Sequence, residues 1–296
     1  MKSVSVIVAT YRRDTALEAA LESLAKQTYA NMEIVLVDDN DDAVWNGKVA
    51  EIVETFRGRY PDVALQVIVN SPNQGSAKTR NIGIEAAKGE YITFLDDDDI
   101  YLPEKLAKQV AFMEQGDYDY SVTDLLLYNE ADKQIGKRIR TYIKDYDISS
   151  LREYHLKYHM TGTDTMMYKK EYLTTIGGFA PIDVGDEFYL MQRSIEAGGK
   201  FGYLAGCDVK AYVHTGEGGL SSGDGKIKGE NDLYEYKKTF FDKVDFSARR
   251  YIRMRHYAVL AFAEIRRKQI ISFGVNAVKS FFCAPIACMK LFLVER

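Results

Sequence analysis

The chain has 296 residues, of which 46% are hydrophobic and 28% are charged, and its formal net charge is −4. This composition is typical of a globular protein and disfavours a disordered, collagen-like or coiled-coil chain. The acidic balance supplies no uniformly basic field, so we expect no nucleic-acid partner.

The first hundred residues alternate short β-rich runs with helical segments. The predicted strands are residues 4–9, 33–37, 65–69 and 91–95, and the predicted helices are residues 15–27, 44–57 and 75–88. Thr15 and Glu18 match a capping box for the first helix. The βαβαβαβ order predicts a doubly wound, mostly parallel α/β sheet with its ligand site at the carboxyl ends of the strands.

The pattern becomes mixed after Pro103. We expect a helix over 104–114, a strand over 120–128, a hairpin through 134–140 and a strand over 165–169. A Gly-rich stretch at 216–225 indicates a mobile loop or lid, and helical periodicity continues from there to the C-terminus. The predicted division is a catalytic domain over 1–225, with halves at 1–102 and 103–225, followed by a helical extension over 226–296.

The sequence favours a cytoplasmic protein. Its three cysteines form no CxxC pair, which fits a reducing compartment, and the N-terminal apolar run is too short for a signal-peptide core. The segment closest to a membrane span, 270–294, contains Lys279, Pro285 and Lys290. We therefore expect no span, while binding to a membrane surface stays open.

Four consecutive carboxylates, Asp96 to Asp99, follow the predicted strand 91–95. Such like charges repel one another unless cations offset them, and Mg²⁺ or Mn²⁺ takes oxygen ligands from carboxylates and substrate phosphates. The run therefore suits a metal–diphosphate complex. A solvated acidic turn that caps the following helix is the structural alternative.

A second acidic motif, Val37-Asp38-Asp39-Asn40, also ends a predicted strand. A carboxylate at this position can accept hydrogen bonds from a ribose hydroxyl or a base N–H, although turn chemistry explains part of the motif. Neither a Walker A sequence nor GxGxxG follows the first strand, which argues against P-loop NTPases and NAD dehydrogenases.

Six motifs in this order resemble family 2 glycosyltransferases of the GT-A fold. They are SVIVATYRR at 5–13, VDDN at 37–40, NQGSAKTRNIG at 73–83, DDDD at 96–99, GGF at 177–179 and GDE at 185–187. The resemblance covers roughly the first two hundred residues. It implies a Rossmann-like sheet flanked by helices and an inverting transfer that depends on a nucleotide sugar.

The resemblance also implies roles for single residues. The residues that it places around the nucleotide are Thr10, Tyr11, Arg13, Asp39, Arg80, Asp96 and Asp97. Within this set, Asp39 contacts the base, Asp96 contacts the ribose, and Arg80 lies near the phosphates or ribose. Tyr11 could instead be an ordinary strand-end aromatic residue, and Arg80 a purely structural cation.

The implied cofactor is a divalent metal, Mn²⁺ or Mg²⁺, held by Asp98 with Asp97 and Asp99 in support. Several related enzymes use a late histidine as an additional ligand, and His214 occupies such a place at the end of a predicted strand. A structural role for His214 remains the alternative.

For the catalytic base, the resemblance points to the acidic pair Asp186-Glu187, whose order departs from the common Glu-Asp. Counting back six residues from Arg193 selects Glu187, with Asp186 as the second candidate. Both could instead be acids that stabilise a helix N-terminus. Residues Thr161, Gly162 and Thr163 fall where such folds shape the donor-sugar or acceptor pocket.

The C-terminal segment carries a cluster of basic residues followed by aromatic and aliphatic ones, an arrangement suited to anionic membrane surfaces. The alternative is a helix pair packed on the catalytic domain or on a second subunit, so a homo-oligomer stays open.

The expected function is a metal-dependent hexosyltransferase. It would move a sugar from a nucleoside diphosphate donor, favoured as UDP-linked, to a glycan or lipid-linked glycan in cell-surface polysaccharide biosynthesis. It would work in the cytoplasm, and a place at the inner face of the cytoplasmic membrane stays open. A sugar-1-phosphate nucleotidyltransferase and a non-catalytic glycan-binding or assembly subunit are the alternatives.

Overall fold

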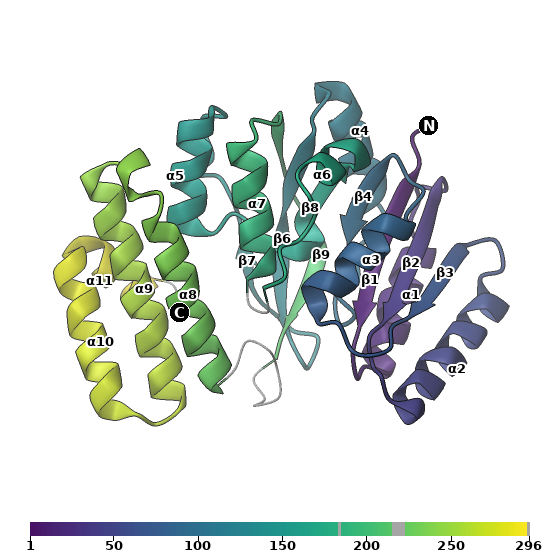
Figure 1. The fold of residues 1–296 in the computed structure, drawn as a ribbon, viewed down its shortest axis with the longest axis horizontal. Coiled ribbons are helices and arrows are strands. Elements are labelled where there is room, and N and C mark those ends of the chain that lie inside the picture. Colours follow the sequence, from purple (N-terminus) through teal and green to yellow (C-terminus); the bar gives the residue numbers. More distant parts are fainter. Residues whose placement is uncertain (183–184, 215–222, 295–296) are drawn as a thin grey trace. The chain divides into compact units, whose positions relative to one another are not determined.

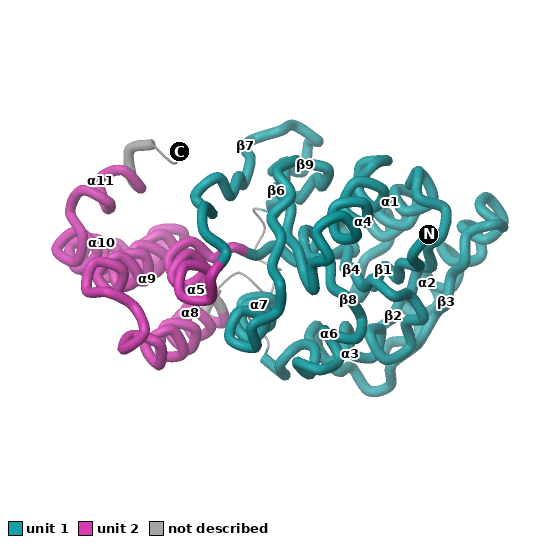
Figure 2. The backbone as a smooth tube through the Cα atoms, turned by 90° about the horizontal axis from the view of Figure 1, so that it is seen from above, with its two compact units in different colours: residues 1–146, 161–182, 186–214 teal, residues 147–160, 183–185, 215–296 magenta. Residues whose placement is uncertain are grey.

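A computed structural model describes residues 1–182, 185–214 and 223–294. The chain divides into two compact units (Figure 2). Unit 1 comprises residues 1–146, 161–182 and 186–214, and unit 2 comprises residues 147–160, 183–185 and 215–296. Residues 147–160 therefore group with the C-terminal helices, although they lie in the middle of the sequence.

Unit 1 is built on a mixed sheet whose strand order is β3-β2-β1-β4-β8-β6-β9-β5, with β7 paired to β6 (Figure 1). The first four strands are β1 (Val4–Thr10), β2 (Met32–Asp38), β3 (Ala64–Val69) and β4 (Tyr91–Phe94). They pair in parallel, as expected. Nearly all of β1, β2 and β4 is buried, which is why these strands read as continuous apolar runs.

The predicted crossover helices are present as α1 (Thr15–Ala25), α2 (Ala43–Arg59) and α3 (Ser76–Ala86). The prediction that Thr15 and Glu18 form a capping box at the start of α1 is wrong. The N-cap is Asp14, whose carboxylate accepts a hydrogen bond from the backbone N–H of Thr15, and Thr15 is already helical. Helix α3 lies close to β1 because Gly83 has no side chain: a Cβ there would be 2.5 Å from Cγ2 of Ile7.

The predicted helix over 104–114, strands and hairpin are also present. The remaining elements of unit 1 follow in chain order. They are β5 (Ile100–Tyr101), α4 (Lys105–Gly116), β6 (Tyr120–Asn129), β7 (Gln134–Arg138), η1 (Thr163–Thr165), β8 (Met166–Lys169), α6 (Lys170–Thr175), α7 (Asp186–Glu196) and β9 (Phe201–Val213). Of these, β5, η1 and α6 were not predicted. The hairpin is formed by β6 and β7. Strand β8 runs antiparallel to both β4 and β6, which joins the two halves of the sheet.

Unit 2 is helical. It contains α5 (Ile148–Tyr158), α8 (Gly223–Lys238), η2 (Phe241–Lys243), α9 (Phe246–Arg266), α10 (Ile270–Cys283) and α11 (Pro285–Val294). Most of the predicted Gly-rich loop at 216–225 lies outside the described residues, and for 223–225 the expectation is wrong because these residues begin α8. Among the described helices, none combines the length and apolarity needed to cross a membrane.

Candidate functional site

The polar motifs of unit 1 gather where its parallel strands end. Thr10 is the last residue of β1, Asp38 is the last of β2, and the acidic run begins one residue beyond the end of β4, after Leu95. Strand β1 lies between β2 and β4, so the three motifs occupy adjacent positions along one edge of the sheet. This edge is where open α/β sheets bind ligands.

Asp97 joins the loop after β1 to the acidic run. Its Oδ2 accepts hydrogen bonds from the hydroxyl of Thr10 at 2.7 Å and from the backbone N–H of Tyr11 at 3.1 Å. The ring of Tyr11 is exposed, whereas Thr10 is buried. Two of the residues expected at the nucleotide are thus held by a third.

Asp98 is brought together with His214, the other residue expected to bind the metal. Nε2 of His214 lies 3.0 Å from Oδ2 of Asp98, and Nη2 of Arg13 donates to the same oxygen at 2.7 Å. Nδ1 of His214 lies 3.4 Å from Oε1 of Glu130. A carboxylate and an imidazole at this separation fit a divalent cation, and both side chains reach the solvent.

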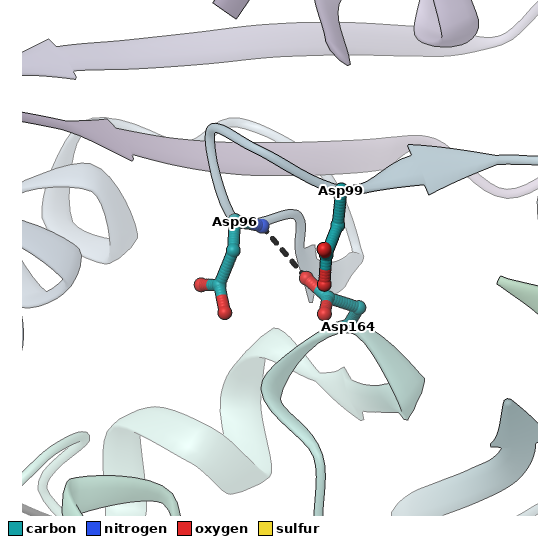
Figure 3. Close-up of side chains that lie close together, drawn as sticks. All are labelled: Asp96, Asp99 and Asp164. Atoms are coloured by element: carbon teal, nitrogen blue, oxygen red, sulfur yellow. Dashed lines mark hydrogen bonds between the residues drawn. The ribbon is translucent and has the colours of Figure 1, made fainter. Parts of the chain in front are cut away.

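A second carboxylate cluster is formed by Asp96, Asp99 and Asp164, with one oxygen from each lying within 4.8 Å of the others (Figure 3). Asp164 accepts a hydrogen bond from the backbone N–H of Asp96 at 2.6 Å. Asp99 accepts one from the backbone N–H of Tyr212 at 2.8 Å. Asp99 and Asp164 are buried, and Asp96 is the more exposed member.

Sequence reasoning missed Asp164. It directly follows the predicted pocket residues Thr161, Gly162 and Thr163, and it enters the site because η1 precedes β8, the neighbour of β4. The three residues expected in the sugar or acceptor pocket immediately precede Asp164 in the chain, and both threonines are buried. The available signal was a lone carboxylate just before a predicted strand, which by itself indicates no more than a turn.

The buried Lys105 supports the two segments that carry the acidic cluster, one after β4 and one before β8. Nζ of Lys105 donates to the hydroxyls of Thr93 and Tyr101, at 2.8 and 2.7 Å. The Tyr101 hydroxyl in turn donates to the backbone carbonyl of Phe94 and lies 3.0 Å from that of Asp164. Burial lowers the pKa of Lys105 well below its usual value. This network fixes the backbone on which the carboxylates are mounted.

Arg80 connects the acidic run to α7. Its Nη2 donates to Asp96 and its Nη1 to Asp186, each at 2.7 Å. Burial opposes the charged form, but these two carboxylates outweigh it and raise the pKa of Arg80 above its usual value. The guanidinium is therefore a permanent cation between the two acidic groups.

The two candidates for the catalytic base, Asp186 and Glu187, are the first two residues of α7. Burial raises the pKa of Asp186 to about 6, Arg80 acts in the opposite direction, and the neighbouring Glu187 adds to the increase. Both oxygens of Asp186 are engaged, since Oδ1 accepts from the backbone N–H of Glu187 at 2.9 Å and Oδ2 from Arg80. Glu187 is only half-buried. Asp186 is thus fixed in place, and Glu187 lies closer to solvent.

Asp39, the residue expected to contact the base of the nucleotide, is buried. Its carboxylate accepts hydrogen bonds from the neighbouring loop. It accepts hydrogen bonds from the backbone N–H groups of Gln74 at 2.8 Å and Gly75 at 2.9 Å. The side-chain amide of Asn70 donates to it at 2.8 Å. These contacts hold the loop that leads into α3, the helix that carries Arg80.

The acidic site makes a testable prediction about pH. Burial, together with the charge of Asp98, raises the pKa of Asp97 to about 7, and burial with the charge of Asp96 raises that of Asp164 to about 7. In the unfolded chain both groups lose their protons near pH 4. Between these values the folded protein binds more protons, so its free energy of unfolding falls as pH rises, by up to about 1.4 kcal/mol per pH unit for each group.

Urea unfolding in metal-free buffer, at a series of pH values from about 5 to 8, measures this slope. The Asp97→Asn variant should lose the contribution of one group and give a shallower decline. A stability that stays level or increases over this range would contradict the assigned pKa values.

Comparisons with known proteins identify relatives of the chain. Residues 5–177, more than half of the chain, match the family described as Glycosyl transferase family 2. An uncharacterised glycosyltransferase of Haemophilus influenzae is 33% identical over 180 residues, which are 60% of this chain and 56% of the relative. The Escherichia coli protein WfaP, named UDP-Glc:alpha-D-GlcNAc-diphosphoundecaprenol beta-1,3-glucosyltransferase, is 36% identical over 115 residues, or 38% of this chain and 42% of WfaP. The chain thus spans about half the length of these curated relatives.

Two solved structures share the fold. TarS 1–349 of S. aureus, in complex with UDP-GlcNAc, has a TM-score of 0.62 at 18% sequence identity. The match covers 95% of this chain and 91% of the TarS chain. The mannosyltransferase PcManGT of Pyrobaculum calidifontis, in complex with GDP-Man and Mn²⁺, has a TM-score of 0.58 at 18% identity and covers 100% and 88%. The expected GT-A fold is confirmed.

Proposed function

The chain belongs to glycosyltransferase family 2, and on this premise we propose that it transfers a sugar, with inversion, from a nucleoside diphosphate sugar to a hydroxyl group of a glycan or lipid-linked glycan. One observation carries the proposal: Arg80 bridges the acidic run after β4 and the acidic pair that begins α7. An arginine side chain is well suited to bind phosphate groups. Arg80 thus lies between the acidic run, a candidate metal site, and Asp186, a candidate base.

We propose a UDP-linked donor. In support, WfaP is named as a user of UDP-Glc and TarS was solved with UDP-GlcNAc, although PcManGT was solved with GDP-Man. The acceptor named for WfaP is linked to diphosphoundecaprenol, which supports a lipid-linked acceptor and a role in cell-surface polysaccharide synthesis. Such an acceptor would place the enzyme at the inner face of the cytoplasmic membrane.

We propose that Asp98 and His214 hold the divalent metal, Mn²⁺ or Mg²⁺. Both side chains are accessible to a diphosphate, whereas Asp99 and Asp164 are buried and already tie the backbone together. When bound, the metal stabilises the negative charge that develops on the departing diphosphate. Arg13, which contacts Asp98, and Arg80 add positive charge on the same side.

Glu187 is the proposed general base. It takes the proton of the acceptor hydroxyl while Asp186, fixed by Arg80, keeps the first turn of α7 in place. Thr10, Tyr11, Asp39 and Asp97 form the proposed nucleotide surface, and Asp96 contacts the ribose. Thr161, Gly162 and Thr163 line the proposed sugar or acceptor pocket.

A thermal-stability experiment tests the donor site. UDP with Mn²⁺ at about a hundred times its dissociation constant should stabilise the folded protein by roughly 2.7 kcal/mol, and UDP without metal by much less. The Asp98→Asn variant should lose the metal-dependent part of this response. UDP, GDP and their sugar conjugates are compared in the same assay.

The matched control is Asp164→Asn, which alters the buried cluster. If Asp164→Asn removes the Mn²⁺ response and Asp98→Asn retains it, the metal belongs to the Asp96, Asp99 and Asp164 cluster instead. If no nucleoside diphosphate shifts the transition, the transferase proposal is refuted and a non-catalytic role takes its place. Release of pyrophosphate from a nucleoside triphosphate would indicate a nucleotidyltransferase.

A further inference from the structure

Helix α10 presents an apolar row of side chains that its neighbours in unit 2 leave uncovered. The row consists of Ile271, Val275, Val278 and Phe282, whose spacing of four, three and four residues places them on one face of the helix. Ile271 is 85% exposed and Phe282 is 74% exposed. Large apolar side chains rarely expose themselves as a continuous row without a binding role. We call these four residues the α10 row.

The α10 row is distinct from the face by which α10 packs. On the opposite face Ser280 is fully buried, and its hydroxyl donates to the backbone carbonyl of Met254 in α9 at 2.9 Å. Ser280 also contacts Cys288 of α11, which packs with Met254 and Ala258. The core between α9, α10 and α11 is therefore already closed without the α10 row.

The charge around the row is mainly positive, although Nη1 of Arg267 lies 3.6 Å from Oε2 of Glu264, just before this segment. Residues 265–294 contain no Asp or Glu and five exposed basic residues: Arg266, Arg267, Lys268, Lys279 and Lys290. This segment carries +5, and because the whole chain carries −4, the remaining residues carry −9. The apolar row thus lies in a strongly basic segment of an acidic protein.

We propose that the α10 row, with these five basic residues, binds the surface of an anionic lipid bilayer. Ile271, Val275, Val278 and Phe282 enter the boundary between headgroups and acyl chains, and the basic side chains contact the anionic headgroups. A second copy of the chain is a poorer occupant, because pairing two such faces would bring two segments of +5 together. The helix lies on the bilayer, in agreement with the absence of a spanning helix among the described residues.

This inference extends the proposed function. It rests on that function only to explain why binding to a lipid surface would be useful. A lipid-linked acceptor cannot leave its membrane, so an enzyme held at the surface meets it by diffusion in two dimensions. Lipid binding itself requires neither donor nor acceptor. The two proposals can therefore fail independently.

Vesicle sedimentation of the full chain tests the proposal. We expect binding to vesicles of phosphatidylcholine with phosphatidylglycerol, little binding to phosphatidylcholine alone, and weaker binding as salt increases. The Ile271→Ser/Phe282→Ser variant should lower the partition coefficient by about tenfold or more. Changing Arg267 and Lys268 to Gln should lower it by about fivefold for each charge removed.

The matched control is Val44→Ser in α2 of unit 1, because Val44 is 70% exposed and lies outside the basic segment. It should bind vesicles like the wild type. Each variant is first checked for an unchanged unfolding transition and for stabilisation by UDP with Mn²⁺, so that a failed donor site is recorded separately.

Three outcomes would overturn the proposal. One is that anionic vesicles do not bind the wild type, and another is that the Ile271/Phe282 and Val44 variants bind equally well. The third is that sedimentation velocity without lipid shows a dimer that the Ile271/Phe282 variant abolishes, which would make a second copy the occupant of the α10 row.

Discussion

Replacing Glu187 with Gln is expected to lower kcat by about 10²- to 10⁴-fold, the usual contribution of a positioned general base. Gln has the size of Glu but cannot take a proton, so the acceptor hydroxyl would lose its base while the shape of the site is kept. Turnover is measured as nucleoside diphosphate release with a donor and acceptor pair that the wild type uses. Stabilisation by UDP with Mn²⁺ should remain as in the wild type, since Glu187 makes no proposed contact with the donor nucleotide.

Asp186→Asn is the control for this variant, because the two acids are adjacent and only one is proposed to take the proton. Asn can keep the hydrogen bond from the backbone N–H of Glu187, but it carries no charge, so the ion pair with Arg80 is lost. We expect this variant to lose stability and to retain more activity than Glu187→Gln. If Asp186→Asn abolishes turnover and Glu187→Gln does not, Asp186 is the base.

Replacing Arg80 with Met is expected to destabilise the protein by about 3–5 kcal/mol, the usual effect of removing one partner from a buried ion pair. Arg80 and Asp186 are both largely buried, with side chains 12% and 7% exposed, so Asp186 would be left as an uncompensated buried charge. Equilibrium unfolding in urea measures the loss. The variant should recover stability as the pH falls, because protonation of Asp186 removes that charge.

The double variant Arg80→Met/Asp186→Asn separates charge from packing. Removing both charges should restore part of the lost stability, since a buried pair replaced as a whole costs much less than a broken one. A double variant as unstable as the sum of the two single variants would contradict an energetic coupling between Arg80 and Asp186.

Arg80 also has a consequence for the reaction. Because one guanidinium contacts Asp96 in the acidic run and Asp186 in α7, a change on the donor side is transmitted to the position of the proposed base. The Arg80→Met variant should therefore lose both the response to UDP with Mn²⁺ and turnover, whereas Glu187→Gln loses turnover alone.

The sequence by itself determined the framework of unit 1 and the place of its chemistry. Runs such as residues 4–9 and 33–37 are long enough, and contain few enough polar residues, to be buried parallel strands. Carboxylates follow two of these predicted strands. Parallel strands with right-handed crossovers put their carboxyl ends on one edge, so order along the chain was enough to gather Thr10, Asp38 and Asp96.

Only the tertiary structure decided how the carboxylates divide between partners. Asp98 lies with Arg13 and His214, Asp97 with Thr10, and Asp96 and Asp99 with Asp164. These partners are separated by dozens of residues, and a four-residue acidic run looks the same in sequence whichever side chains it meets. Asp164 in particular enters through the antiparallel pairing of β8 with β4, a contact that no local pattern encodes.

The same reason explains the placement of residues 147–160 with the C-terminal helices. Helix α5 was not predicted from the sequence. Even a clear helical pattern there would indicate an apolar face but not which surface covers it, because many helices offer equivalent stripes. Local sequence thus determines elements and their order, whereas the choice among chemically similar partners depends on the packed arrangement of the whole chain.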